Sequence, residues 1–163
     1  MARNLTLVTA LFAILLSLDT FACSFAPGYR TFELSSTRPP SSGPTPATPS
    51  LSIQSIKRGT DDGNFASCSD AGVLTVSLND PEAAKNIGFL FELESGSFPD
   101  KVLPDEIVAP IELADGSLGF YFVWLDLPTG QSAVEPIDVK VSVRAVSPTM
   151  VEGSKVILDI QSP

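Results

Sequence analysis

Short runs of alternating apolar and polar residues dominate the chain after Ser50. The clearest run is 137–146, whose strict period of two is typical of a strand with one face in a core. Its inward side is expected to carry Val139, Val141, Val143 and Ala145, and its solvent side Asp138, Lys140, Ser142 and Arg144. Residues 155–161 repeat the pattern, with Val156, Leu158 and Ile160 inward.

Seven such runs follow one another about ten to fifteen residues apart, separated by turn residues. The predicted strands are residues 51–57, 73–78, 87–94, 106–113, 118–125, 137–146 and 155–161. In the third strand the core side is expected to hold Ile87, Phe89, Phe91 and Leu93, opposite Glu92 and Glu94. Proline and glycine interrupt helical spacing, so only residues 81–86 have room for a helical turn. The pattern predicts an all-β, seven-stranded antiparallel sandwich.

The order of these runs resembles that of a fibronectin type III domain or a close immunoglobulin-like relative. The matching segments are 72–81, 86–93, 127–130 and 139–147 with Gly153. They look like the family's second and third strands with their proline-containing connection, its leucine-containing approach to the sixth strand, and that strand with its following turn. Leu78 and Val139 stand where the family carries a core tryptophan and a tyrosine. The resemblance implies an immunoglobulin-like sandwich.

The N-terminus has the pattern of a bacterial signal peptide. Arg3 precedes a mostly apolar run of about fourteen residues, 5–18, and small residues follow near Ala22. The run is shorter than the roughly twenty residues that a membrane-spanning helix needs. We therefore expect residues 1–22 to be removed on export.

The two cysteines leave two ways of holding the mature N-terminus. Residues 20–23, Thr-Phe-Ala-Cys, resemble the lipobox of bacterial lipoproteins, in which the cysteine is acylated and becomes the new N-terminal residue. This resemblance makes Cys23 the expected lipid anchor, and Ser24 after it implies an outer-membrane destination. The alternative is ordinary cleavage after Ala22, which leaves Cys23 and Cys68 to form a disulfide in a periplasmic or secreted protein.

A stretch rich in proline, serine and threonine separates this region from the strands. Residues 35–50 hold five prolines and no hydrophobic periodicity, so we expect a semi-extended spacer. Tyr29, Phe32 and Leu34 form a short apolar motif before it. The expected organisation is a signal peptide at 1–22, an anchor segment and linker at 23–50, and a sandwich domain at 51–163.

The composition narrows the function mainly through what is missing. A formal net charge of −9 opposes binding to nucleic acid. The chain has no histidine, so it lacks the commonest general base, the usual zinc ligand and a Ser-His-Asp triad. No glycine-rich phosphate loop follows a predicted strand. We therefore expect no catalytic residues, no cofactor and no enzyme activity.

Two groups of acidic residues keep alternatives open. Glu92 and Glu94 are expected about 7 Å apart on one strand face, a separation that paired-acid glycoside chemistry uses, although a solvated strand face is the preferred interpretation. The loop 61–64, Asp-Asp-Gly-Asn, with Asp70 nearby, offers oxygen ligands for calcium. It lacks the spacing and the terminal glutamate of a calcium-binding helix-loop-helix. A polar turn is preferred there, and no metal site is expected.

The strand 118–125 is apolar on both faces. Leu118, Phe120, Phe122 and Trp124 alternate with Tyr121, Val123 and Leu125. One face is expected to fill the core, and the other is covered by residues 29–34 or a neighbouring loop, or else forms an exposed aromatic patch. Tyr121, Val123 and Leu125 are the candidate binding patch in the second case.

Signal, anchor, spacer and sandwich are the parts of a surface module. We therefore expect a non-catalytic β-sandwich, tethered to the bacterial cell envelope, that serves in binding, adhesion or as a scaffold. Its partner is expected to be an unidentified envelope or extracellular protein or carbohydrate, with the membrane reached through the lipid on Cys23. The alternative is a small secreted hydrolase that uses acidic residues.

Overall fold

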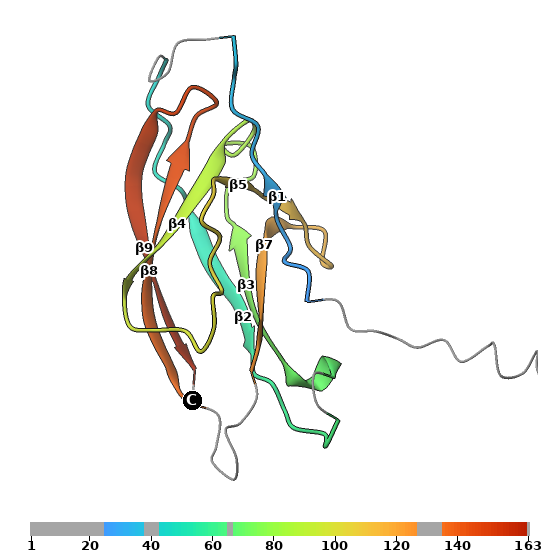
Figure 1. Cartoon of the computed structure of the whole chain (residues 1–163). Coiled ribbons are helices and arrows are strands. Elements are labelled where there is room, and N and C mark those ends of the chain that lie inside the picture. The colour runs from blue at the N-terminus through green and yellow to red at the C-terminus, as the bar shows by residue number, and fades with distance from the viewer. Residues whose placement is uncertain (1–24, 38–42, 65–66, 127–134, 163) are drawn as a thin grey trace, which may run out of the picture.

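The computed structural model describes residues 25–37, 43–64, 67–126 and 135–162, which form two antiparallel sheets packed face to face (Figure 1). The strands are β1 (Arg30–Thr31), β2 (Leu51–Lys57), β3 (Ala71–Leu78), β4 (Gly88–Ser95), β5 (Val108–Ala109), β6 (Ile111–Glu112), β7 (Leu118–Leu125), β8 (Ile137–Val146) and β9 (Glu152–Ser162). One sheet has the order β1-β5-β4-β8-β9, and the other has the order β2-β3-β7-β6. The predicted all-β class and the two-layer architecture are confirmed.

The predicted strand at 106–113 is two short strands, because the chain changes sheets in its middle. β5 pairs with β1 and β4, whereas β6 pairs with β7 in the facing sheet. Pro110 lies between the two strands. Proline has no backbone N–H to donate to a ladder, so it is suited to the point where one sheet is left for the other.

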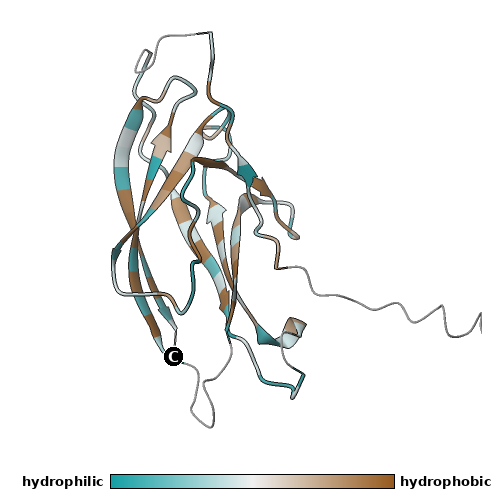
Figure 2. Cartoon of the chain, in the orientation of Figure 1, coloured by the Kyte–Doolittle hydropathy of each residue, from teal (hydrophilic) through white to brown (hydrophobic). Residues whose placement is uncertain are grey.

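Apolar side chains from both sheets meet in one core. Figure 2 shows hydrophobic and hydrophilic residues alternating along the long strands, as a sandwich with one buried face per sheet requires. Phe120 and Phe122 of β7 and Phe91 of β4 are almost completely buried. The Phe91 ring lies 5.0 Å from that of Phe120 and 5.1 Å from that of Phe122, both edge-to-face. Edge-to-face rings add to the stability gained from burial alone, so these contacts help to hold the sheets together.

The predicted exposure of two side chains, Leu93 and Ser142, is wrong. Leu93 is 44% exposed, because β4 continues past the core and its pairing with β8 shifts register between Leu93 and Ser95. Ser142 is completely buried although it points to the outer face. β8 is a central strand, and Ser142 lies between the longer side chains of Glu92 and Ile157 on the neighbouring strands.

The segment before the predicted domain also belongs to the sandwich. β1 pairs with β5, and Ser35 N–H donates to the Pro148 carbonyl at 2.7 Å. Tyr29 packs against the core, and Phe32 lies against Gly88, while Leu34 is 45% exposed. The sheet therefore takes in residues before the expected boundary at 51.

The described end of the predicted spacer also lies on the domain. A methyl group added to Gly153 of β9 would be 2.7 Å from the Pro46 carbonyl oxygen, so these two backbones are in close contact. Pro49 is buried. Residues 81–86, expected to hold a helical turn, form consecutive turns in which Ala84 N–H donates to the Pro81 carbonyl. Within the described ranges, no helix has the length and apolar character to cross a membrane.

Candidate functional site

The outer face of the β2-β3-β7-β6 sheet carries the predicted binding patch. Because Phe120, Phe122 and Trp124 fill the core, alternation along β7 turns Tyr121, Val123 and Leu125 outward. Tyr121 and Val123 are half-buried, and Leu125 is 36% exposed. On β3 their direct partners are Thr75, Val73 and Ala71. The three candidate residues therefore form one continuous row on this face.

A shallow groove of about 350 Å³ lies beside Tyr121. Its lining residues come from all four strands of the sheet and from the β6–β7 turn. They are Gln54, Val73, Thr75, Glu112, Leu113, Ala114, Asp115 and Tyr121. The Gln54 amide donates to the Asp115 carboxylate. Hydrogen bonds from the Ser117 hydroxyl and N–H lower the pKa of Asp115. The groove thus has an apolar floor with a charged and amide-bearing rim.

The described N-terminal segment reaches the patch at Tyr121. Gly28 and Tyr121 exchange two backbone hydrogen bonds, of 2.8 and 3.1 Å. A Cβ at Gly28 would be 2.0 Å from the Tyr121 ring, so the ring lies directly over this glycine. Tyr29 turns inward instead, with its ring 6.0 Å from that of Phe122. Within the described residues, the contact with Tyr121 comes from Gly28, which lies outside the expected covering segment 29–34, and Arg30 and Thr31 of that segment pair with β5 of the other sheet. Leu125 stays 36% exposed.

The two glutamates considered for hydrolysis lie on β4 of the opposite sheet, where Glu92 forms an ion pair with a residue of β8 and Glu94 with a residue of β9. Glu92 pairs with Arg144, and Glu94 pairs with Lys155 at 2.8 Å. The Lys155 hydrogen bond lowers the pKa of Glu94. A general acid at neutral pH needs a raised pKa, so this environment favours the ionised state instead.

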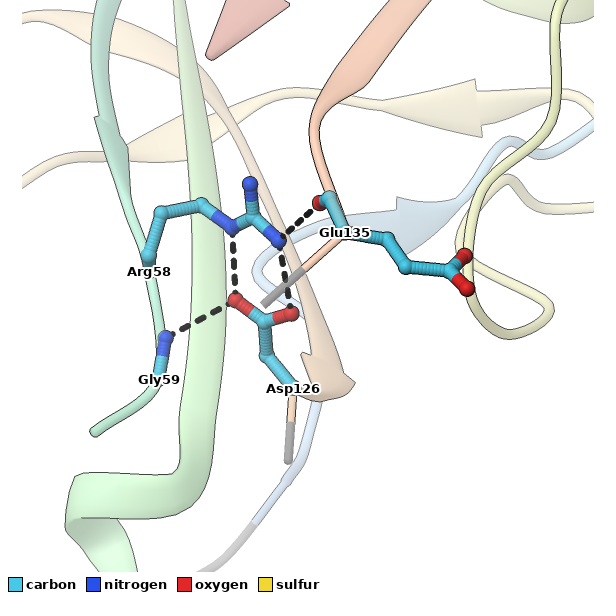
Figure 3. A network of polar contacts seen from close by, with 4 residues as sticks. All are labelled: Arg58, Gly59, Asp126 and Glu135. Carbon is cyan, nitrogen blue, oxygen red and sulfur yellow. Dashed lines mark hydrogen bonds and ion pairs between the residues drawn. The ribbon is translucent and has the colours of Figure 1, made fainter. Parts of the chain in front are cut away.

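A buried ion pair closes one end of the sandwich, and the sequence reasoning missed it (Figure 3). The Asp126 carboxylate accepts from Arg58 Nε at 2.8 Å, Arg58 Nη2 at 3.1 Å and Gly59 N–H at 2.8 Å. Arg58 Nη2 also donates to the Glu135 carbonyl at 2.7 Å. Burial raises the pKa of Asp126, but the Arg58 and Gly59 hydrogen bonds outweigh it and hold that pKa below its ordinary value. The only sequence signal was that Arg58 and Asp126 directly follow two predicted strands.

The same pair anchors the loop 58–70. Asp126 N–H donates to the Asp70 carbonyl at 2.8 Å, and Thr60 N–H donates to the Ser69 carbonyl at 2.7 Å. The loop ends in a short 3₁₀ helix, η1 (Cys68–Asp70), directly before β3. The acidic residues considered for calcium are therefore held on a fixed base.

The fold and the geometry of these sites can be compared with those of known proteins. No protein-family model, curated protein or solved structure matches the chain. Function must therefore be argued from the residues of these sites alone.

Cys68 is disulfide-bonded at the edge of the loop. Cys23, the other cysteine of the chain, lies outside the described residues, as do residues 1–22 of the expected leader. The choice between lipid anchor and disulfide at Cys23 stays a prediction.

Proposed function

We propose that this chain is an exported, non-catalytic binding module whose ligand face is the outer face of the β2-β3-β7-β6 sheet. The outward row of Tyr121, Val123 and Leu125, with a groove beside it, carries the proposal. Apolar side chains gathered beside a groove on a sheet face are a feature of interaction sites.

The groove favours a carbohydrate over an apolar ligand. An aromatic ring beside a groove offers its face to the C–H groups of a sugar ring, while amide groups donate and accept hydrogen bonds and carboxylates accept them from sugar hydroxyls. Tyr121 supplies the ring, and Thr75, Gln54 and Glu112 supply polar groups around it. We therefore propose an envelope or extracellular glycan as the partner, with a protein partner as the alternative.

The absence of histidine and the environment of the acidic residues support a non-catalytic role. Glu92 and Glu94 are used in ion pairs with Arg144 and Lys155, and the lowered pKa of Glu94 is opposite to that of a general acid. The alternative of a small secreted hydrolase gains no support from them.

The strand order supports the resemblance to immunoglobulin-like and fibronectin type III domains. An immunoglobulin constant-type sandwich has strands A-B-E-D in one sheet and C-F-G in the other. Taking β2 as strand A, the order β2-β3-β7-β6 reproduces the first sheet, and β4-β8-β9 reproduces the second. The two short strands β5 and β1 then extend the second sheet beyond strand C.

Retention at the envelope depends on Cys23. Acylation of Cys23 would tether the module to the outer membrane, whereas a Cys23–Cys68 disulfide would tie the N-terminus to the sandwich and give a periplasmic or secreted protein. The bonded state of Cys68 supports the second form, because an acylated Cys23 has no thiol left to pair.

Co-sedimentation with purified peptidoglycan sacculi tests the proposed function. We expect the protein to pellet with sacculi and Tyr121→Ser to weaken binding roughly 3- to 10-fold, in line with the value of one aromatic contact. Ile157→Ser is the matched control, since Ile157 is 43% exposed on β9 of the opposite sheet. Thermal melts of both variants check that they are folded. Failure of the native protein to pellet, or an equal loss in both variants, would overturn the proposal.

A further inference from the structure

Three aspartates converge at the loop that Arg58 and Asp126 anchor. Asp61, Asp62 and Asp70 each place a carboxylate oxygen within 4.8 Å of the other two. Asp61 and Asp62 are exposed, whereas Asp70 is completely buried. Among the described residues, no lysine or arginine forms an ion pair with any of the three. Three carboxyl groups are thus brought together without an ion-pair partner among the described residues.

Asp70, the buried member of this cluster, has one carboxylate oxygen that is unsatisfied as a hydrogen-bond acceptor among the described residues. Asp70 Oδ2 accepts the Ser67 N–H at 2.8 Å, but Asp70 Oδ1 is buried and has no hydrogen-bond partner among the described residues. A buried carboxylate oxygen that has lost water and gained no donor is strongly unfavourable. A buried carboxylate with one oxygen in this state, grouped with two further carboxylates, is the arrangement that a bound cation satisfies.

We propose that Asp61, Asp62 and Asp70 bind a calcium ion. Calcium takes oxygen ligands at 2.3–2.6 Å, so two ligands on opposite sides of the ion are roughly 4.6–5.2 Å apart. The three oxygens lie within 4.8 Å of one another, so a single ion can reach all of them. The cluster offers only carboxylates, and Cys68 beside it is disulfide-bonded and therefore not a thiolate ligand. The donor set thus suits a hard cation and not zinc.

The loop fixes the two exposed ligands with donors from its own backbone and hydroxyls. Asp61 Oδ1 accepts the Gly63 N–H at 2.8 Å, and Asp62 Oδ1 accepts the Asn64 N–H at 2.9 Å. The hydroxyls of Ser67 and Ser69 donate to Asp62 Oδ2. Hydrogen bonds to a ligating carboxylate orient it and keep it ionised. The pKa of Asp62 is accordingly lowered to about 2, first by the Ser69 hydrogen bond.

This site is independent of the proposed glycan groove. Its ligands come from the loop 58–70, whereas the groove is lined by residues of β2, β3, β6, β7 and the β6–β7 turn. Calcium is expected to stabilise the end of the sandwich where η1 leads into β3. With only three protein ligands and water completing the shell, we expect a dissociation constant of roughly 10⁻⁴–10⁻³ M, as in extracellular modules.

Thermal unfolding of the full chain, stripped of metal with EDTA, tests the site. We expect 10 mM CaCl₂ to favour the folded state by roughly 10- to 100-fold in the folding equilibrium, which follows from that affinity range. NaCl at matched ionic strength controls for screening of the net charge of −9. Calorimetric titration with CaCl₂ should give one ion per chain.

Variants separate a built site from a general response to cations. Asp70→Asn should abolish the calcium-dependent shift of the folding equilibrium. Asp61→Asn should reduce that shift at least tenfold, and it changes an exposed residue that still accepts the Gly63 N–H. Asp80→Asn is the matched control, because Asp80 is an exposed aspartate that accepts a backbone N–H in another turn. No shift with the native chain, an equal shift with NaCl, or a full shift in Asp61→Asn would each overturn the proposal.

Discussion

The Arg58–Asp126 pair makes a quantitative prediction about stability. Asp126 is 1% exposed and Arg58 14%, so removing the guanidinium leaves a carboxylate that water barely reaches. Arg58→Met removes both hydrogen bonds of the ion pair and the bond to the Glu135 carbonyl, while the Gly59 N–H stays on Asp126. Breaking a buried pair from one side destabilises by about 3–5 kcal/mol. Because Gly59 still compensates part of the charge, we expect about 3 kcal/mol.

Urea unfolding at pH 7 measures this difference. A loss of about 3 kcal/mol is a large share of the roughly 5–15 kcal/mol that stabilises a typical domain, and it should lower the Tm by roughly 6–12 °C. Lys140→Met is the matched control, since Lys140 and Asp159 form an ion pair in which both side chains are about half exposed. Exposed pairs contribute little, so this variant should unfold close to the native midpoint.

The stability that the ion pair contributes should fall as the pH is lowered. The pKa of Asp126 is lowered in the folded state. Its contribution is therefore fully present above the unfolded-state pKa of about 3.9, and it is lost as the pH falls through the lower folded-state pKa. The difference in stability between native protein and Arg58→Met should be largest near neutral pH and should shrink as the pH falls and the carboxyl group of Asp126 becomes protonated.

A double variant checks the cause. Arg58→Met combined with Asp126→Leu removes the unpaired charge as well, so it should recover part of the lost stability. If Arg58→Met costs less than about 1 kcal/mol, or no more than Lys140→Met, the pair is not the buried structural element described here.

Three further outcomes are expected. Gly72→Ala should destabilise the protein by about 1–3 kcal/mol and alter the near-ultraviolet dichroism of Trp124, since its Cβ would lie 2.1 Å from that ring; an unchanged spectrum would contradict the packing. NMR titration should place the pKa of Asp62 at about 2, so its contribution to stability is present above about pH 4 and is lost towards pH 2; a midpoint near 4 would contradict its hydrogen bonds. The intact mass of the exported protein should lack residues 1–22 and increase by two hydrogens on reduction, as a Cys23–Cys68 disulfide requires, whereas an added lipid mass would establish the anchor.

The strands could be predicted because their signal is local. Alternation of apolar and polar residues located β2, β7 and β8 with their observed bounds, and it located the other long strands to within a few residues. The pairing of β1 with β5 left no such signal, because a two-residue strand has no period and its partner lies far along the chain. The same alternation placed Tyr121, Val123 and Leu125 on one face of the sheet. It could not predict that Gly28 pairs with Tyr121 at the edge of that face.

The polar sites depended on contacts that no periodicity reports. Arg58 and Asp126 are 68 residues apart, and each alone reads as a solvated charge at a strand end. The sequence showed that the loop is rich in acidic residues, and a polar turn was the preferred interpretation. The burial of Asp70, which the sequence did not indicate, favours a calcium site instead. Burial of a charged side chain is set by the whole fold, so it is the property that sequence patterns predict least well.

The proposed ligand face can be tested residue by residue by ¹⁵N chemical-shift mapping with soluble peptidoglycan fragments. The account predicts concentration-dependent amide shifts along the outer face, centred on Tyr121 and its β3 partners Thr75 and Val73, with the β4-β8-β9 side unchanged. Shifts confined to the β4-β8-β9 sheet, or no shifts at millimolar fragment, would contradict the assignment of this face as the glycan-binding surface.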